Sequence, residues 1–316
     1  MGKVIGKLLI AISLVVFAIA VFTLLTTNVS AGLAITEEND VFLPRNLHSD
    51  EYYTQGADIG WQFTNRTVTG IRERMYTPSN ISDPNMRILD RPWAATLSAY
   101  LECWDINPDN AIKYGVEAGV MGPDANGKFL QSTIHKWIGS PEPKGWAYQM
   151  PGEPILQLYG EYWTPVFCLG TPGSWGSQLY LPIGCNVGTT YINASGGLAF
   201  TAGWNPHAIT MDISIPKLSS NSSKGFCCFT AAGRYYYVAH NATLGSSFFH
   251  DSDARWMKNS WEVDITPSVL EGRIGVIAGY GLFSAGYYIE SRTREFETQG
   301  PAANWATLRF GLGTEF

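Results

Sequence analysis

The segment of residues 122–154 contains the side chains best suited to chemistry. Residues 125–138 are expected to form a short helix, on which Gln131, Ser132 and His135 share one face. Imidazole has an ordinary pKa of about 6.5, close to neutral pH, so a histidine on such a face is a candidate general base toward water. Two other interpretations stay open: His135 is an ordinary surface residue, or it activates the Ser132 hydroxyl as a nucleophile.

Two further groups of polar residues stand at the ends of expected strands. Asn39 and Asp40 end the first strand, and Thr54 begins the second. Carboxylate and amide oxygens suit a hard cation, although an Asn-Asp pair also commonly forms a turn. Thr54 shares its parity with Asp58 and alternates with the apolar Ile59, so it is expected to face the inside of a sheet wall, where it can equally be a plain polar wall residue.

The elements that must position these residues are strands with alternating side chains. Within residues 93–103 every odd position is apolar, and the even positions from 96 onward carry polar or amphipathic groups. The same period of two recurs at residues 55–63, 113–120, 155–162, 227–240, 285–294 and 305–316. Segments of about ten alternating residues separated by turns are typical of a transmembrane barrel. A soluble all-β sandwich is the alternative.

We predict twelve strands, an even number as single-chain bacterial barrels require. The last of them carries Leu312 and the terminal Phe316 on one face, and a terminal aromatic residue is typical of barrels inserted into the outer membrane. The expected fold is therefore an all-β transmembrane antiparallel barrel with a short helix in its third extracellular loop. The expected strands are residues 32–41, 53–63, 68–77, 92–105, 110–121, 154–166, 179–190, 195–204, 226–241, 268–282, 284–297 and 303–316.

The first 31 residues have the layout of a cleavable export signal. Lys3 and Lys7 precede an apolar run over residues 8–25, and small residues lead to Ala31; a membrane anchor is the alternative. Cleavage removes two lysines and leaves residues 32–316 as a single domain with 19 basic and 27 acidic side chains, a formal net charge of −8. This charge disfavours nucleic acid as a partner. The 16 tyrosines and 11 tryptophans suit the two membrane interfaces.

Strand parity brings the polar groups to one rim of the expected barrel. A chain that starts in the periplasm runs outward on odd strands, so the loops after strands one, three and five are extracellular. Asn39, Asp40, Thr54 and His135 are therefore expected to meet at the outer rim.

The sequence resembles the outer-membrane lipid A 3′-O-deacylase family in three separate places. The resemblance is clear over residues 38–154, and the rest of the chain resembles the family only as a barrel pattern. The matching residues are Asn39-Asp40, Tyr53-Thr54-x-Gly56, and in the long loop Gly122-Pro123-Asp124-Ala125, Gln131, His135 and Gly139; Asp90-Arg91-Pro92 also fits.

The resemblance implies a hydrolase that removes the 3′-linked acyl chain of lipid A from lipopolysaccharide in the outer leaflet. It implies a site between the outer wall and the loop helix, a calcium cofactor and a histidine-activated water. His135 is then the base, Asn39 and Asp40 hold calcium, and Thr54 and Gln131 support water, metal or substrate. A monomer in the outer membrane is expected.

Other residues match less directly. Arg87 and Arg91 are candidate contacts for the phosphates of the substrate, although their loop has mixed charge. The five cysteines are an odd number, which leaves at least one unpaired. Cys168 and Cys185 flank a candidate turn and are a possible pair, and Cys103 is expected on the lipid face as a small apolar residue.

Two other functions remain open for such a barrel. One is a pore or surface adhesin without catalysis, which predicts no effect of changing His135. The other is an outer-membrane phospholipase, which would release lysophospholipid rather than free fatty acid from lipid A.

Cleavage of the export signal gives the first prediction. Mass spectrometry of the protein extracted from outer membranes should show a chain that begins at Gly32, because the small residues ending at Ala31 fit the cleavage site. A mature protein that retains Met1 would instead support the anchor.

Overall fold

The computed structural model describes residues 32–44, 51–64, 66–85, 89–107, 110–208, 225–245, 248–249, 263–281 and 283–313. The expected export signal, Arg87 and Phe316 lie outside these ranges. None of the helices within them has both the length and the apolar character to cross a bilayer.

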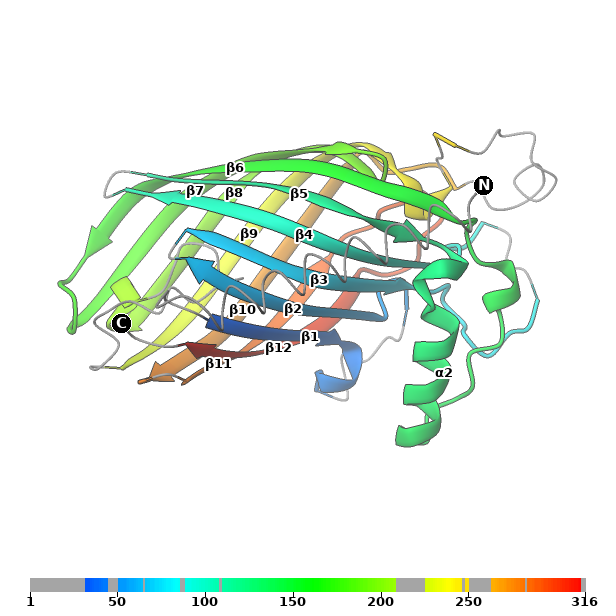
Figure 1. Ribbon diagram of the computed structural model, residues 1–316, viewed down its shortest axis with the longest axis horizontal. Coiled ribbons are helices and arrows are strands. Elements are labelled where there is room, and N and C mark those ends of the chain that lie inside the picture. Colours follow the sequence, from blue (N-terminus) through cyan, green and yellow to red (C-terminus); the bar gives the residue numbers. More distant parts are fainter. Residues whose placement is uncertain are drawn as a thin grey trace.

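The protein is a closed antiparallel barrel of twelve strands, as predicted (Figure 1). Each strand pairs with its neighbours in sequence, and β1 pairs with β12 to close the wall. The strands are β1 (Gly32–Asn39), β2 (Gln55–Thr64), β3 (Thr67–Tyr76), β4 (Ala94–Ile106), β5 (Ala111–Met121), β6 (Glu153–Leu169), β7 (Trp175–Gly188), β8 (Tyr191–Trp204), β9 (Phe226–Asn241), β10 (Ser268–Tyr280), β11 (Phe283–Arg292) and β12 (Ala303–Gly313).

The described parts of the connections contain one α-helix and several short 3₁₀ helices. The loop between β5 and β6, residues 122–152, contains α2 (Gly127–Ile138), as expected, between η3 (Pro123–Ala125) and η4 (Trp146–Tyr148). The other described 3₁₀ helices are η1 (Asp40–Phe42), η5 (Pro206–Ala208) and η7 (Ala242–Leu244). Asp40 was expected in the first strand, but it begins η1, because the Asn39 side chain accepts a hydrogen bond from the Val41 amide and turns the chain.

The predicted alternation separates a lipid-facing surface from a polar lumen. Ile59 and Leu101 are exposed on the outer surface, whereas Asp58 and Glu102 line a cavity inside the barrel. Arg72 crosses this interior to Asp58 at 2.9 Å and to Glu117 at 3.2 Å. Charged side chains of the wall therefore neutralise one another inside, where bilayer lipid does not reach them.

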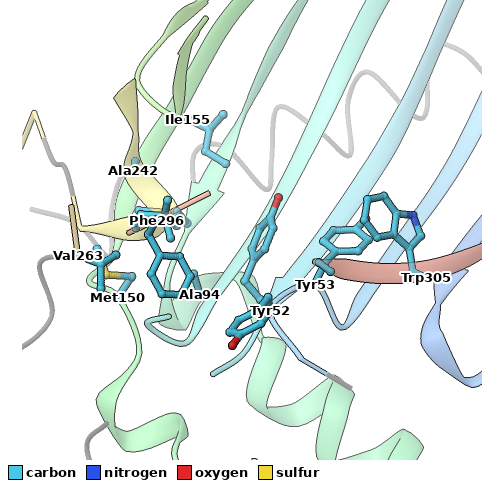
Figure 2. Packing of buried hydrophobic residues seen from close by; sticks show 13 residues of the cluster. Tyr52, Tyr53, Ala94, Met150, Ile155, Ala242, Val263, Phe296 and Trp305 are labelled. Carbon is cyan, nitrogen blue, oxygen red and sulfur yellow. The ribbon is translucent and has the colours of Figure 1, made fainter. Parts of the chain in front are cut away.

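An apolar cluster, here called the inner cluster, fills the barrel mouth at the loop-rich rim (Figure 2). The rings of Tyr53 and Trp305 lie 4.7 Å apart, and Phe296 is fully buried. Outer-membrane barrels carry their longer loops on the extracellular side, so this rim is the outer one. The buried members are Tyr52, Tyr53, Tyr76, Ala94, Met121, Met150, Ile155, Ala242, Leu244, Val263, Phe296, Ala303 and Trp305. Because these side chains fill the mouth, they argue against an open pore, one of the alternatives that the sequence left open.

A buried ion pair lies beside the inner cluster. Arg91 donates to the Glu295 carboxylate at 2.6 Å and stacks on the Tyr76 ring at 4.3 Å, with its side chain fully buried. Burial acts to raise the pKa of the Glu295 carboxyl, but Arg91 and Arg292 outweigh it and hold that pKa below its ordinary value. This pair therefore stabilises the fold above the unfolded pKa of about 4.3, and its contribution is lost as the pH falls through the folded pKa.

The ion pair gives a stability prediction. Replacing Arg91 by methionine should leave the Glu295 carboxylate buried without its main partner, which costs about 3–5 kcal/mol when a buried pair is broken. The temperature at which the unboiled electrophoretic band is lost should fall clearly, and the Arg91→Met/Glu295→Gln double variant should recover part of the difference. An Arg91→Met protein as heat-resistant as the wild type would contradict this role of the pair.

Candidate functional site

The helix α2 ends in a tight backbone turn that places His135 in its last turn. Gly139 follows the helix with φ of 73°, a left-handed conformation that glycine adopts without strain. The amides of Gly139 and Ser140 both donate to the His135 carbonyl, the latter at 2.9 Å. A histidine at a helix C-terminus also suits the negative end of the helix dipole.

The start of α2 packs against the lipid-facing side of the wall. A Cβ atom added to Gly127 would lie 2.5 Å from the Ala95 Cβ and 2.6 Å from the Trp146 ring, so only glycine allows this contact. A second apolar group, here called the outer cluster, surrounds this contact and combines outward residues of β3–β5 with residues of the adjoining connections. Its buried members are Met75, Ile81, Trp93, Ala95, Val120, Ala125 and Trp146.

The buried face of α2 consists of Gly127, Gln131 and His135, spaced four residues apart. The His135 ring is held by its Nδ1 atom, which lies 2.6 Å from the Pro141 carbonyl oxygen. A carbonyl oxygen only accepts, so Nδ1 carries the hydrogen, and the Nε2 atom of the neutral ring has its lone pair available. The ring is thus oriented as a general base requires.

Gln131 is fixed by a tryptophan that the sequence analysis did not single out. Trp146 donates from Nε1 to the Gln131 side-chain oxygen at 2.7 Å, and its ring packs against Trp93 at 4.9 Å. Gln131 is only 1% exposed, and its amide nitrogen has no hydrogen-bond partner among the described residues. This nitrogen is therefore a buried, fixed donor that a bound group can reach without competing with a described side chain.

Asn39 and Asp40 lie at the end of β1, where η1 turns over the outer wall. The Asn39 side-chain oxygen accepts from the Val41 amide at 3.0 Å, and an amide oxygen has a second lone pair. Asp40 is buried. The Tyr287 hydroxyl, on an outward position of β11, donates to the Phe42 carbonyl at 2.9 Å, which holds η1 against the lipid-facing side.

The elements α2 and η1 stand on the same side of the wall. Asn39, Gln55, Met75 and Ala95 form one register row from β1 to β4, which spans about 14 Å at the usual strand spacing. Eight residues of helix advance about 12 Å, and Figure 1 shows α2 leading from the rim where β4 starts toward the side where η1 lies. The helix thus carries His135 toward the end of β1.

Thr54 lies at the same rim, directly before β2 begins, where the sequence predicted it inside the strand. Its hydroxyl lies 2.6 Å from the hydroxyl of Thr77, which has the parity of the outward Met75, so the inward orientation expected for Thr54 stays a prediction. The neighbouring Tyr53 hydroxyl donates to the Glu38 carboxylate. Thr54 is therefore held at the rim from which η1 and α2 also extend.

Two carboxylates that the sequence analysis passed over lie on the outward face near this site. Glu37 and Glu73 occupy the same register row of β1 and β3, with Ala57 between them. Glu73 is 7% exposed, and neither of its carboxylate oxygens has a hydrogen-bond partner among the described residues. The sequence offers a sign of these two residues, because both stand at odd positions of their strands, where the barrel pattern predicts apolar, lipid-facing side chains.

The structure also bears on the expectations for Arg91, Ser132 and the cysteines. Arg91 holds Glu295 inside the barrel mouth, so its guanidinium is not presented to a phosphate at the surface. Within the described chain no hydrogen bond joins Ser132 to His135. All five cysteines are free, and the possible pairing of Cys168 with Cys185 is wrong, since they oppose Gln178 and Gly160, about 26 Å apart along β6.

The side-chain oxygens of Asn39 and Asp40 fit part of a calcium site. They are oxygens, the ligands that calcium takes, and Asp40 supplies one negative charge. No group of three or more His, Cys, Asp or Glu side chains gathers at a possible metal position in the described ranges. The two residues fit calcium as part of a set that water or substrate oxygens would have to complete.

Comparisons with known proteins agree on a family. A model of the family described as outer membrane protein LpxR matches residues 8–313. The structure of LpxR from Salmonella typhimurium matches with a TM-score of 0.74 at 20% identity, covering 89% of this chain and 99% of that chain. The β domain of the Bordetella autotransporter BrkA reaches a TM-score of only 0.39 at 9% identity, covering 91% and 98%. A comparison with curated protein sequences found no match. The chain belongs to the LpxR family of outer-membrane proteins.

Proposed function

We propose that this protein is a lipid A deacylase, which hydrolyses the 3′-linked acyl ester of lipopolysaccharide in the outer leaflet. Membership of the LpxR family supports the reaction class. The observation that carries the proposal is the position of His135, held through Nδ1 by the Pro141 carbonyl on a helix fastened to the lipid-facing side of the wall. A base in this place is next to the leaflet that contains the substrate.

The base step follows from the orientation of the ring. The Nε2 atom of His135 takes a proton from water as the water oxygen attacks the ester carbonyl carbon. The same nitrogen returns the proton to the sugar oxygen when the carbon–oxygen bond breaks, which releases a free fatty acid. The Pro141 carbonyl stabilises the positively charged ring between the two transfers, because it faces the Nδ1 hydrogen.

Developing negative charge on the carbonyl oxygen needs donors or a cation. The Gln131 amide nitrogen is a suitable donor, because it is held by Trp146 and lacks another partner in the described chain. Asn39 and Asp40 would hold calcium, which when bound supplies positive charge to polarise the ester carbonyl. Arg91 is left without a proposed phosphate role, since it is committed to Glu295, whereas Arg87 stays a candidate contact for the substrate phosphates.

A serine route is the weaker mechanism. It requires the Ser132 hydroxyl to bond the base, whereas Nδ1 of His135 is occupied by Pro141 and no bond to Ser132 exists in the described loop. A phospholipase acting at the same rim is distinguished by its product.

The histidine prediction tests the mechanism. His135→Ala should lower the rate of fatty acid release from lipid A by about 10²–10⁴-fold, the usual contribution of a general base, while the barrel still assembles. Mass spectrometry of lipid A from cells that express each variant measures this. Ser132→Ala should retain most of the activity, and His207→Ala, at the opposite rim, is the matched control.

Three results would count against this mechanism. Full activity in the His135 variant removes the base, loss in Ser132→Ala alone favours an acyl-enzyme, and lysophospholipid as the product favours a phospholipase.

The calcium prediction concerns Asp40. Chelation should stop turnover, and Asp40→Asn should need much more calcium for the same rate, because it keeps the shape but removes the charge. Calorimetry with calcium alone should show weaker binding to Asp40→Asn, with the exposed Glu297→Gln at the same rim as control. An unchanged calcium requirement in Asp40→Asn would refute the assignment.

A further inference from the structure

The helix α2 has a second face, opposite to the one that carries His135. Phe129, Thr133 and Trp137 are spaced four residues apart and follow Gly127, Gln131 and His135 by two positions, which is about 200° around the helix. Phe129 is 70% exposed and Trp137 is 81% exposed. With the neighbouring Ile138, which is 56% exposed, they form an exposed apolar patch of the kind that marks a protein or membrane interaction site.

The 3₁₀ helix η1 exposes apolar side chains on the same outward side of the wall. Val41 is 47% exposed and Phe42 is 36% exposed, although η1 is held against the outer wall by Tyr287. The register row from Asn39 of β1 to Ala95 of β4 has η1 next to Asn39 and the start of α2 next to Ala95. Exposed apolar groups therefore flank both sides of the candidate site.

The chemistry of α2 selects a membrane surface rather than a protein partner. The helix carries Lys128 and Lys136, both exposed, and no acidic residue. Aromatic and basic side chains together are typical of helices that lie in an anionic lipid interface. The surface also continues the lipid-facing wall, since α2 is packed on outward residues such as Ala95.

We propose that the exposed faces of α2 and η1 insert into the outer leaflet and bind its anionic glycolipid. Trp137 and Phe129 lie among the acyl chains near the headgroups, and the two lysines meet the phosphates. His135, on the opposite face of the same helix, then stands at the depth of the acyl esters, so the substrate enters laterally without leaving the leaflet. This last consequence rests on the proposed deacylase function, whereas the insertion itself does not.

The insertion is measured directly by ¹⁹F NMR of protein labelled with 5-fluorotryptophan, in nanodiscs of lipopolysaccharide and phosphatidylethanolamine. The Trp137 resonance is assigned by its absence in Trp137→Phe. Lipid that carries a spin label high on its acyl chain should broaden the Trp137 resonance. The exposed, outward Trp175 at the other rim should be broadened in the same way. A water-soluble gadolinium chelate should broaden the Trp137 resonance little. The buried Trp305 of the inner cluster is the internal control, and it should be broadened less than Trp137 by the lipid label and little by the chelate. A Trp137 signal broadened by the chelate and untouched by the lipid label would overturn the proposal.

A second measurement separates this proposal from the deacylase function. The NMR experiment is repeated in His135→Ala, where the same broadening is expected because insertion needs no catalysis. In active protein, Phe129→Ser/Trp137→Ser should lower the ratio of activity on bilayer lipopolysaccharide to activity on detergent-dispersed lipid A by roughly tenfold. An unchanged ratio would refute the link between insertion and substrate access. If the wild-type protein shows the broadening but has no deacylase activity, only the proposed reaction is refuted.

Discussion

The pairing of β1 with β12 is the constraint on which the rest of the structure depends. Inside a bilayer an unpaired backbone amide or carbonyl has no water to bond, so a transmembrane sheet has to close. Here the ladder from Gly32 opposite Gly313 to Asn39 opposite Ala306 closes it. Closure places the end of β1 beside β12, in addition to its sequence neighbour β2, at the loop-rich rim. Asn39 and Asp40 stand at this rim because they lie directly at the end of the closing ladder.

Near this rim, consecutive residues of one strand serve two different apolar clusters. Tyr76 belongs to the inner cluster and Met75 to the outer one, and Ala94 and Ala95 divide in the same way. The reason is the period of two, which turns successive side chains to opposite faces of the wall. The inner cluster fills the mouth, and the outer cluster fastens α2 to the lipid side. One short stretch of wall thereby both blocks the lumen and mounts the candidate base.

Two buried polar groups near this rim have no hydrogen-bond partner among the described residues, which lowers the stability of the folded protein. Glu73 is buried on the outward face, two residues along β3 from Met75, and the Gln131 amide nitrogen is buried on the face of α2 that packs toward the wall. Burying such groups without hydrogen bonds is costly, and natural proteins keep few of them. The Gln131 nitrogen shares the buried face of α2 with His135, which is consistent with a site whose polar partners come from a bound molecule.

The sequence by itself determined the barrel, its twelve strands, the loop helix and the rim at which Asn39, Thr54 and His135 gather. These features are local, because alternation, turn residues and strand parity can be read along the chain. Only the tertiary structure decided that Pro141 orients the His135 ring, that Trp146 holds Gln131, and that Arg91 is paired with Glu295, 204 positions away. Side-chain contacts of this kind depend on which strands closure brings together and on which side of the wall a loop folds. No periodicity in the sequence encodes either.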